Sequence, residues 1–152
     1  MRTRSMKVID MAVQTVATIT EEKTIEQCAL QMRQEHVGSL VVVNENHMPV
    51  GMITDRDIAI EVVALGKNPA QALVKDVMTT PVVTAFTDEN MVVALARMRE
   101  FGIRRLPIVD HDGKLVAVIS NSNLIEELST LLDSLVRNIH SSKTREVSLR
   151  SC

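Results

Sequence analysis

Two short segments carry residue types that could bind a polar ligand. Residues 54–57 (Thr-Asp-Arg-Asp) and 120–123 (Ser-Asn-Ser-Asn) each place a hydroxyl residue three positions before an acid or an amide. This spacing is typical of a capping box, in which both side chains bind backbone amides at the start of a helix. The same geometry could offer free amides and a positive dipole to a phosphate, while Asp57 accepts hydrogen bonds from a ribose diol. The sequence leaves both interpretations open.

A pair of arginines, Arg104 and Arg105, supplies the second kind of ligand chemistry. A guanidinium group can bind a phosphate through two parallel hydrogen bonds. The alternative is that these side chains are solvated or paired with an acid such as Glu100. Because neighbouring residues of a strand point to opposite faces, we expect only one of the two to enter a binding site fully.

The remaining reactive residue types lack an arrangement that indicates catalysis. Cys28 lies on the apolar face of a predicted helix, where a small core residue is expected, and no structural disulfide with Cys152 is predicted. Free thiols favour the reducing cytoplasm as the location. The sequence contains no glycine-rich phosphate loop and no nucleophile motif. No metal-ligand spacing connects the histidines, which are His36, His47, His111 and His140. We therefore predict no catalytic residue, metal or catalytic cofactor.

The elements that must position these residues occur twice. Sliding the sequence along itself until Val8 meets Val74 aligns residues 8–58 with 74–124 without a gap, and apolar positions match throughout. Each copy predicts the order β-α-β-β-α, with turn signals between the paired strands. The expected strands are 16–18, 40–43 and 50–53, then 82–84, 106–109 and 116–119, and the second helix of each copy is expected over 55–65 and 121–137.

These patterns predict an α/β (α+β) fold of two β-α-β-β-α repeats. The expected boundaries are 8–65 for the first repeat, 66–73 for a linker that contains Gly and Pro, 74–138 for the second repeat and 139–152 for a flexible tail. Neither repeat has much core alone, so the two should pack sheet to sheet with pseudo-two-fold symmetry. Such a pair leaves two equivalent clefts in which a ligand could bind.

Composition argues against several other classes of protein. The chain has no Trp or Tyr to stack bases, and its net charge of −2 supplies no basic field, so nucleic acid is not expected as a partner. Its apolar runs are too short for membrane insertion. The basic opening, residues 1–7, is not followed by an apolar segment, so no signal peptide is expected.

The repeated unit resembles a tandem pair of cystathionine-β-synthase (CBS) domains, also called a Bateman module. The resemblance covers residues 8–130. The runs that carry it are 51–57 (Gly-Met-Ile-Thr-Asp-Arg-Asp) and 102–110 (Gly-Ile-Arg-Arg-Leu-Pro-Ile-Val-Asp). It implies a free-standing regulatory module that binds AMP, ADP, ATP or a related adenosyl ligand, with AMP preferred. It also implies a homodimer in the shape of a flat disk, and a separate enzyme or transporter that the module regulates.

The resemblance also assigns residues to the two clefts. The first cleft would combine a carboxylate, hydroxyls, an apolar wall and two guanidinium groups, from Ile53, Thr54, Asp57, Thr79, Thr80, Pro81, Val82, Arg104 and Arg105. The second cleft would be weaker, because it lacks both the carboxylate and the basic pair. Its residues would be Gln14, Thr15, Val16, Gly38, Ser39, Ile119, Ser120 and Asn123. We therefore predict one occupied nucleotide site per chain.

Two other functions stay open on the sequence. The first is a structural dimerisation module whose clefts bind nothing. The second is an enzyme that acts on nucleotides. The sequence offers no general base and no metal-binding constellation for it, which argues against this function.

Overall fold

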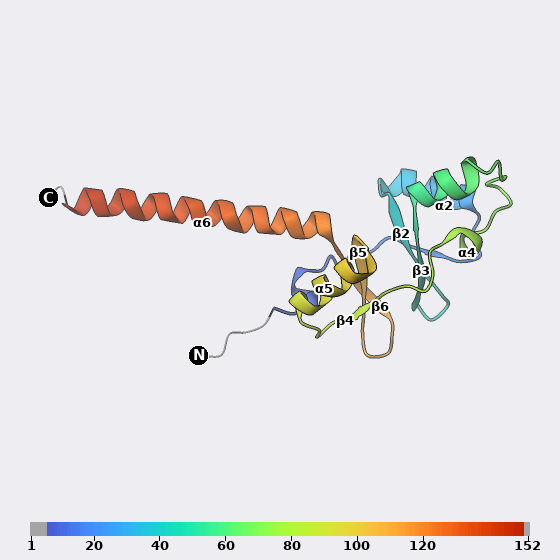
Figure 1. Ribbon diagram of the computed structural model, residues 1–152, viewed down its shortest axis with the longest axis horizontal. Coiled ribbons are helices and arrows are strands. Elements are labelled where there is room, and N and C mark those ends of the chain that lie inside the picture. Colours follow the sequence, from blue (N-terminus) through green and yellow to red (C-terminus); the bar gives the residue numbers. More distant parts are fainter. Residues whose placement is uncertain (1–5, 151–152) are drawn as a thin grey trace. The chain divides into compact units, whose positions relative to one another are not determined.

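The computed structural model describes residues 6–150, so the basic residues up to Ser5, and Cys152, lie outside the described residues. The chain divides into a first unit that ends at Ile119 and a second unit that begins at Ser120. The first unit holds the paired sheets, each of three strands, in the orders β1-β2-β3 and β4-β5-β6 (Figure 1). The second unit is formed mainly by one long helix, α6.

The predicted order β-α-β-β-α is confirmed in both repeats. The first repeat contains α1 (Val8–Met11), β1 (Thr18–Thr20), α2 (Ile25–Glu35), β2 (Ser39–Val43), β3 (Pro49–Thr54) and α3 (Asp55–Ile58), which continues into a π-helical turn, η1 (Ala59–Val63). The second repeat contains α4 (Val74–Val77), β4 (Ala85–Phe86), α5 (Met91–Phe101), β5 (Arg105–Val109), β6 (Leu115–Ser120) and α6 (Asn121–Arg150). The short helices α1 and α4 are additions that the sequence patterns did not predict.

The repeat extends to backbone conformation at matched positions. His36 and Gly102 end α2 and α5 in the left-handed region, with φ of 55° and 63°. His47 and Gly113 take the same region in the two hairpin turns, with φ of 60° and 82°. Each pair has the same separation as Val8 and Val74, although a histidine replaces a glycine in the first copy. The duplicated backbone therefore imposes a left-handed conformation that glycine adopts more easily.

The first strand of each repeat begins later than predicted. The sequence favoured strands at 16–18 and 82–84, whereas β1 spans Thr18–Thr20 and β4 spans Ala85–Phe86. The reason is the parallel pairing with the middle strand, in which Thr18 is opposite Val41 and Ala85 is opposite Ile108. In both repeats this pairing lies C-terminal to most of the predicted strand, so β propensity alone misplaced the boundaries.

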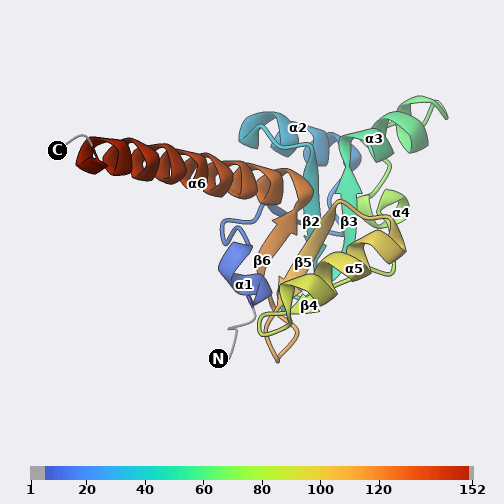
Figure 2. The same cartoon turned by 60° about the vertical axis from the view of Figure 1, so that its left-hand side comes forward.

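The sheets pack against each other as predicted, and β2 shows why. Alternate residues of β2 face opposite ways. Leu40 and Val42 belong to a core with α2, whereas Val41 and Val43 form a second buried cluster with Leu115 of β6. Figure 2 shows the ribbons of α2, β2 and β6. Because both faces of β2 are covered, residues 40–43 of this strand form an unbroken apolar run in the sequence.

The leading short helix of each repeat packs against the other repeat. Val74 and Val77 of α4 lie in the core of the first repeat, and the Val74 amide donates to the Lys23 carbonyl at 2.8 Å. At the matched place, the amide of Val8 in α1 donates to the carbonyl of Glu89 at 3.0 Å. This exchange joins the two repeats into one body and brings the segment after α4 beside the first sheet.

The segment predicted as a flexible tail, residues 139–152, is helical as far as the structure describes it, and its flexibility stays a prediction. Helix α6 continues without interruption to Arg150. The segment lacks apolar periodicity, but it also lacks Gly and Pro, and its Lys, Arg and Leu residues have good helix propensity. Within the described residues, no helix has both the length and the apolar character needed to cross a membrane.

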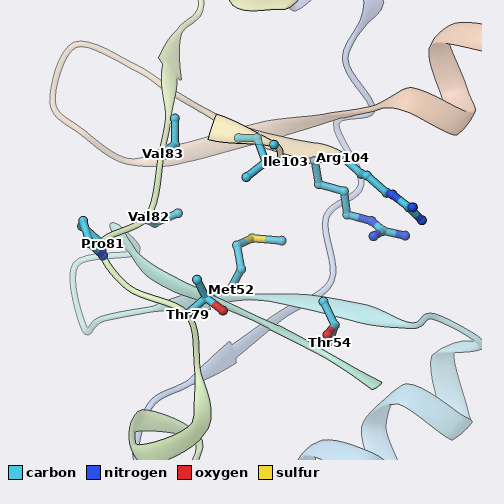
Figure 3. A pocket seen from close by; sticks show the side chains of 10 residues that line it. Met52, Thr54, Thr79, Pro81, Val82, Val83, Ile103 and Arg104 are labelled. Atoms are coloured by element: carbon cyan, nitrogen blue, oxygen red, sulfur yellow. The ribbon is translucent and has the colours of Figure 1, made fainter. Parts of the chain in front are cut away.

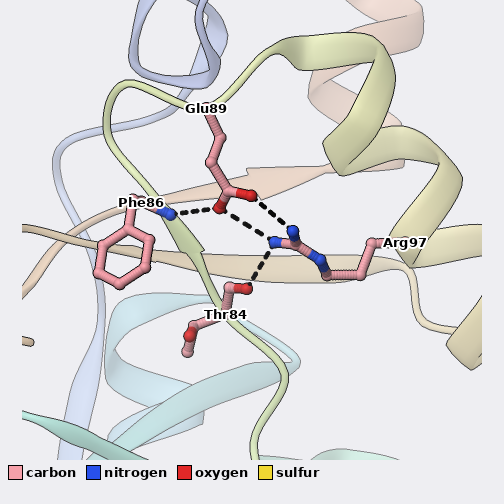
Figure 4. A network of polar contacts seen from close by, with 4 residues as sticks. All are labelled: Thr84, Phe86, Glu89 and Arg97. Atoms are coloured by element: carbon pink, nitrogen blue, oxygen red, sulfur yellow. Dashed lines mark hydrogen bonds and ion pairs between the residues drawn. The ribbon is translucent and has the colours of Figure 1, made fainter.

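An ion pair fastens α5 to the loop that follows β4 (Figure 4). Arg97 Nη1 donates to Glu89 Oε2 at 3.0 Å and to the Thr84 carbonyl at 2.9 Å, and the Phe86 amide donates to the same Glu89 oxygen at 2.6 Å. The two side chains are only 27% and 21% exposed. The hydrogen bond from Arg97 holds the pKa of Glu89 below its ordinary value, although partial burial opposes this shift.

We expect this pair to make the stability of the protein sensitive to acid. A lowered pKa means that the Glu89 carboxylate stabilises the fold fully above the ordinary glutamate pKa, and that this contribution disappears as pH falls through the lowered value. Glu89→Gln should therefore cost about 1–2 kcal/mol at neutral pH, and the difference from wild type should shrink in acid. Urea denaturation of both proteins across this pH range measures the difference. Glu26→Gln, at an exposed position, is the control. A loss of stability in Glu89→Gln that does not change with pH would contradict the argument.

Candidate functional site

A cavity of about 280 Å³ lies beside β3 in the first unit (Figure 3). Three segments enclose it: β3 of the first repeat, the chain that follows α4, and the chain that leads into β5. Its lining residues are Met52, Thr54, Thr79, Pro81, Val82, Val83, Gly102, Ile103, Arg104 and Arg105. In Figure 3, Arg104 and Thr54 lie toward one end, whereas Pro81, Val82 and Val83 lie toward the other. The cavity therefore has a polar end and an apolar end.

The segment that follows α4 forms one wall of the cavity, and backbone hydrogen bonds hold it against β3. The Thr79 amide donates to the Met52 carbonyl at 2.8 Å, and the Met52 amide donates back to Thr79 at 3.2 Å. Gly51 permits this approach, because a Cβ at that position would lie 2.7 Å from Met78 Sδ and 3.1 Å from the Thr79 carbonyl oxygen. A glycine inside a strand often marks such a close approach of another segment.

The structure brings most residues of the predicted first cleft together. Thr54, Thr79, Pro81, Val82, Arg104 and Arg105 all line the cavity, whereas Ile53, Thr80 and Asp57 are not among its lining residues. Ile53 is fully buried in the core of the first repeat, because its side chain leaves the opposite face of β3 from Met52 and Thr54. The Ile53 side chain is therefore not part of the wall of this cavity, and a role for Ile53 in ligand binding stays a prediction.

The capping interpretation of residues 54–57 is realised in full. Thr54 Oγ1 accepts from the Asp57 amide at 3.1 Å, and Asp57 Oδ2 accepts from the Thr54 amide at 2.9 Å. The amides of Asp55 and Arg56 are also bonded, to the Gly38 carbonyl at 2.9 Å and to Asp55 Oδ1 at 2.8 Å. The expectation of free amides for a phosphate at this helix start is therefore wrong, because these hydrogen bonds already use them.

Both arginines line the cavity, against the expectation that only one would enter it. Strand β5 begins at Arg105, so Arg104 lies just before the strand and the alternation of side chains does not constrain it. Within the described residues, neither arginine forms a salt bridge to an acid. Two guanidinium groups in the wall of an otherwise mostly apolar cavity favour a ligand with an anionic group.

Sequence reasoning missed Met52, Val83, Gly102 and Ile103. The signal for Met52 was present, because a residue two positions before Thr54 must share its face of the strand. Gly102 and Ile103 directly precede the arginines, and they were included in the motif run but not assigned to the cleft. Val83 was expected within a strand, and it lines the cavity because β4 begins only at Ala85.

The second cleft remains a prediction, because its residues are divided between the two units. In the first unit, Val16 packs beside the cluster of Val41 and Val43, and Ser39 pairs with Thr54 across β2 and β3. In the second unit, Ser120 Oγ accepts from the Asn123 amide at 3.2 Å and so caps α6.

The cysteine and the hairpin histidines lie outside the cavity beside β3. Cys28 is fully buried in the core of the first repeat, as predicted, and burial raises the pKa of its thiol to about 11, which keeps it protonated and inert. His47 and His111 are exposed in their hairpin turns, as predicted. In the part of the chain that the structure describes, no group of three or more His, Cys, Asp or Glu residues could hold a metal ion.

Comparison with known proteins identifies relatives along most of the chain. The family model for the CBS domain matches residues 8–64 and again residues 74–130. The chain is 38% identical over 109 residues to the CBS domain-containing protein YhcV of Bacillus subtilis, which covers 72% of this chain and 76% of YhcV. It is 40% identical over 123 residues to the protein MK0525 of Methanopyrus kandleri, covering 81% of this chain and 63% of that protein.

A third relative is an enzyme of which the chain matches only a part. Homoserine O-acetyltransferase of Methanococcoides burtonii is 38% identical over 117 residues, which are 77% of this chain but 23% of the enzyme. The chain thus spans less than two thirds of the length of both MK0525 and this enzyme.

Solved structures share the fold. A conserved protein from Pyrococcus horikoshii superposes with a TM-score of 0.72 at 25% identity, over 83% of this chain and 94% of that one. The CBS domain pair of protein MJ0100 superposes with a TM-score of 0.73 at 24% identity, over 83% of this chain and 98% of that pair. The MJ0100 pair was crystallised in complex with 5′-methylthioadenosine and S-adenosyl-L-methionine.

Proposed function

Because the chain belongs to the CBS domain family, we propose that it is a non-catalytic regulatory module that binds an adenine nucleotide or a related adenosyl ligand beside β3. The observation that carries this proposal is the cavity whose wall combines Arg104 and Arg105 with mostly apolar side chains. A phosphate would bind the guanidinium groups, and a purine would lie against Met52 and Ile103.

The size of the cavity favours a nucleoside monophosphate. About 280 Å³ is near the lower end of ligand pockets, which begin at about 300 Å³, so we propose AMP ahead of ATP. The adenosyl ligands of the MJ0100 pair, a protein of the same fold, make this ligand class the first to test. We keep Asp57 as a candidate for the ribose, and one of its two oxygens, Oδ2, already accepts a hydrogen bond from the Thr54 amide.

The downstream role is also part of the proposal. Ligand binding would regulate a separate enzyme or transporter, and it could do so only if the ligand binds one conformation or assembly of the module more tightly than another. We propose a homodimer in the cytoplasm as the state in which this happens.

Thermal unfolding with added nucleotide tests the binding site. AMP at about 100 times its dissociation constant should stabilise the wild type by about 2.7 kcal/mol and raise the melting temperature by about 5–10 °C. The double variant Arg104→Ala/Arg105→Ala should bind AMP at least about 100-fold more weakly, because two charged donors are lost. Arg33→Ala, an exposed arginine on α2, is the matched control and should keep the full shift.

Two results would count against the proposal. Wild-type protein whose melting temperature does not respond to millimolar AMP, ADP, ATP or S-adenosyl-L-methionine would favour the ligand-independent dimerisation module. A double variant that responds like the Arg33→Ala control would place the ligand outside the cavity beside β3.

A further inference from the structure

The apolar wall of the cavity beside β3, residues 81–83, lies just outside the second sheet, because β4 begins only two residues after its end. In the first repeat the position that matches Val83 is Ala17, whose carbonyl accepts a hydrogen bond from the amide of Val41 at 3.1 Å. The position that matches Val41 is Pro107, and proline has no amide hydrogen to donate. The second repeat therefore lacks one backbone bond that holds this part of the chain in the first repeat.

The side chain of Arg97 contacts the residue that follows the apolar wall. Arg97 Nη1 donates to the Thr84 carbonyl at 2.9 Å and to Glu89 Oε2 at 3.0 Å (Figure 4). Both charged side chains are largely shielded from solvent, so water competes weakly for these hydrogen bonds. The pair with Glu89 thus fixes the guanidinium group in the orientation that reaches Thr84.

The first repeat makes the same contact with a neutral side chain. The residue at the position of the arginine is Gln31, and its Nε2 donates to the carbonyl of Thr18, at the matched position, at 2.8 Å. Lys23 stands where the second repeat has Glu89, so the first repeat cannot form an equivalent ion pair there. The ion pair therefore belongs to the repeat whose wall lines the cavity and has lost a backbone bond.

Arg97 also connects the apolar wall to the segment that carries the arginines of the cavity. It lies on α5, four residues before that helix ends at Phe101. The residues directly after α5, 102–105, line the cavity as well. The hydrogen bond to Thr84 therefore sets the position of the apolar wall relative to α5 and to the arginines that follow it. A ligand site depends on such supporting contacts, because small displacements of its walls weaken binding.

We propose that Arg97 is a positioning residue of the ligand site, and that its hydrogen bond to the Thr84 carbonyl holds the apolar wall in the place that the ligand requires. Arg97 is not among the residues that line the cavity, so it acts on the ligand only through the wall. The inference rests on the proposed function for the ligand, AMP, but the mobility of the wall can be measured without a ligand. Ligand affinity should follow the bond to Thr84 rather than the ion pair or the stability of the fold.

Isothermal titration calorimetry with AMP, on the full-length chain, tests the effect on binding. Arg97→Ala should weaken binding by about 10-fold, because the wall loses the contact that holds it in position. Arg97→Gln removes the ion pair, but it can donate to Thr84 as Gln31 does to Thr18. It should therefore bind AMP within about 3-fold of the wild type, although its melting temperature falls.

Gln31→Ala is the matched control, because it removes the equivalent bond from the repeat whose segment does not line the cavity. It should leave the AMP affinity unchanged. Circular dichroism at the temperature of the titration shows whether each variant is folded. Wild-type affinity in Arg97→Ala overturns the proposal. An Arg97→Gln variant that binds as weakly as Arg97→Ala also overturns it, since the ion pair alone would then explain the loss.

Nuclear magnetic resonance relaxation of the ligand-free protein measures how firmly the wall is held. Backbone order parameters over 82–84 should be about 0.85 in the wild type and in Arg97→Gln, and should fall below about 0.6 in Arg97→Ala. Unchanged order parameters in Arg97→Ala overturn the proposal. A wild type that binds no nucleotide refutes the proposed function instead, and the order parameters then decide by themselves whether Arg97 holds the wall.

Discussion

Truncation of Leu106 to alanine is expected to lower the free energy of unfolding by about 3–4 kcal/mol. Leu106 is fully buried in β5, the central strand of its sheet, so deletion of its side chain removes apolar contacts and leaves a cavity. The loss is measured by urea denaturation followed by circular dichroism, with the slope of the transition checked for a change in two-state behaviour.

The duplication supplies both a replicate and a control for this measurement. Leu40 occupies the matched position in β2, where it is 1% exposed, so Leu40→Ala should cost a similar amount. Leu30 on α2 is 54% exposed, and its truncation should cost less than about 1 kcal/mol. A loss for Leu106→Ala no greater than that for Leu30→Ala would contradict the placement of β5 in the core.

Replacement of Gly51 by valine is expected to lower the free energy of unfolding by about 2–3 kcal/mol and to weaken ligand binding at the same time. Its Cβ would lie within 3.1 Å of both Met78 Sδ and the Thr79 carbonyl oxygen. The Met78 side chain can move, whereas the Thr79 backbone is bonded to Met52 and forms a wall of the cavity. The substitution should therefore push that wall away from β3.

A double variant separates the two contacts. Met78→Ala removes the closer of the two contacting groups. Gly51→Ala should therefore cost less stability in the Met78→Ala background than in the wild type. The coupling free energy between the two substitutions measures the steric contact. The AMP-induced melting shift should be smaller in Gly51→Val than in the wild type. Full stability together with an unchanged shift would show that the segment after α4 does not depend on Gly51 for its position.

Local features of the candidate site were predictable from the sequence. The Thr54 and Asp57 capping box depends on side chains and amides within one turn of chain, and the structure forms both of its hydrogen bonds. The ligand interpretation of the same residues required free amides. Hydrogen bonds from the Asp55 amide to the Gly38 carbonyl and from the Arg56 amide to Asp55 Oδ1 use those amides. The first is made to the loop before β2, which spacing alone could not reveal.

The cavity itself depends on contacts between segments distant in the sequence. Thr79 lies beside Met52 because α4 packs into the core of the first repeat, and this exchange carries no periodic signal. The position of Arg104 was misjudged for a related reason. Strand β5 begins one residue after it, and the pairing of β5 with its neighbours sets that boundary rather than the residue types.

The sequence by itself determined the duplicated β-α-β-β-α order, the apolar run of β2 and the two arginines at the start of β5, because these follow from periodicity and local preference. It also held the information for the continuation of α6 beyond residue 138, where the absence of Gly and Pro outweighs the lack of apolar periodicity. Only the tertiary structure decided that α1 and α4 exchange between repeats, that Ile53 faces the core, and that both arginines line the cavity beside β3. Those outcomes depend on long-range packing, in which the side chains of one repeat complete the core of the other.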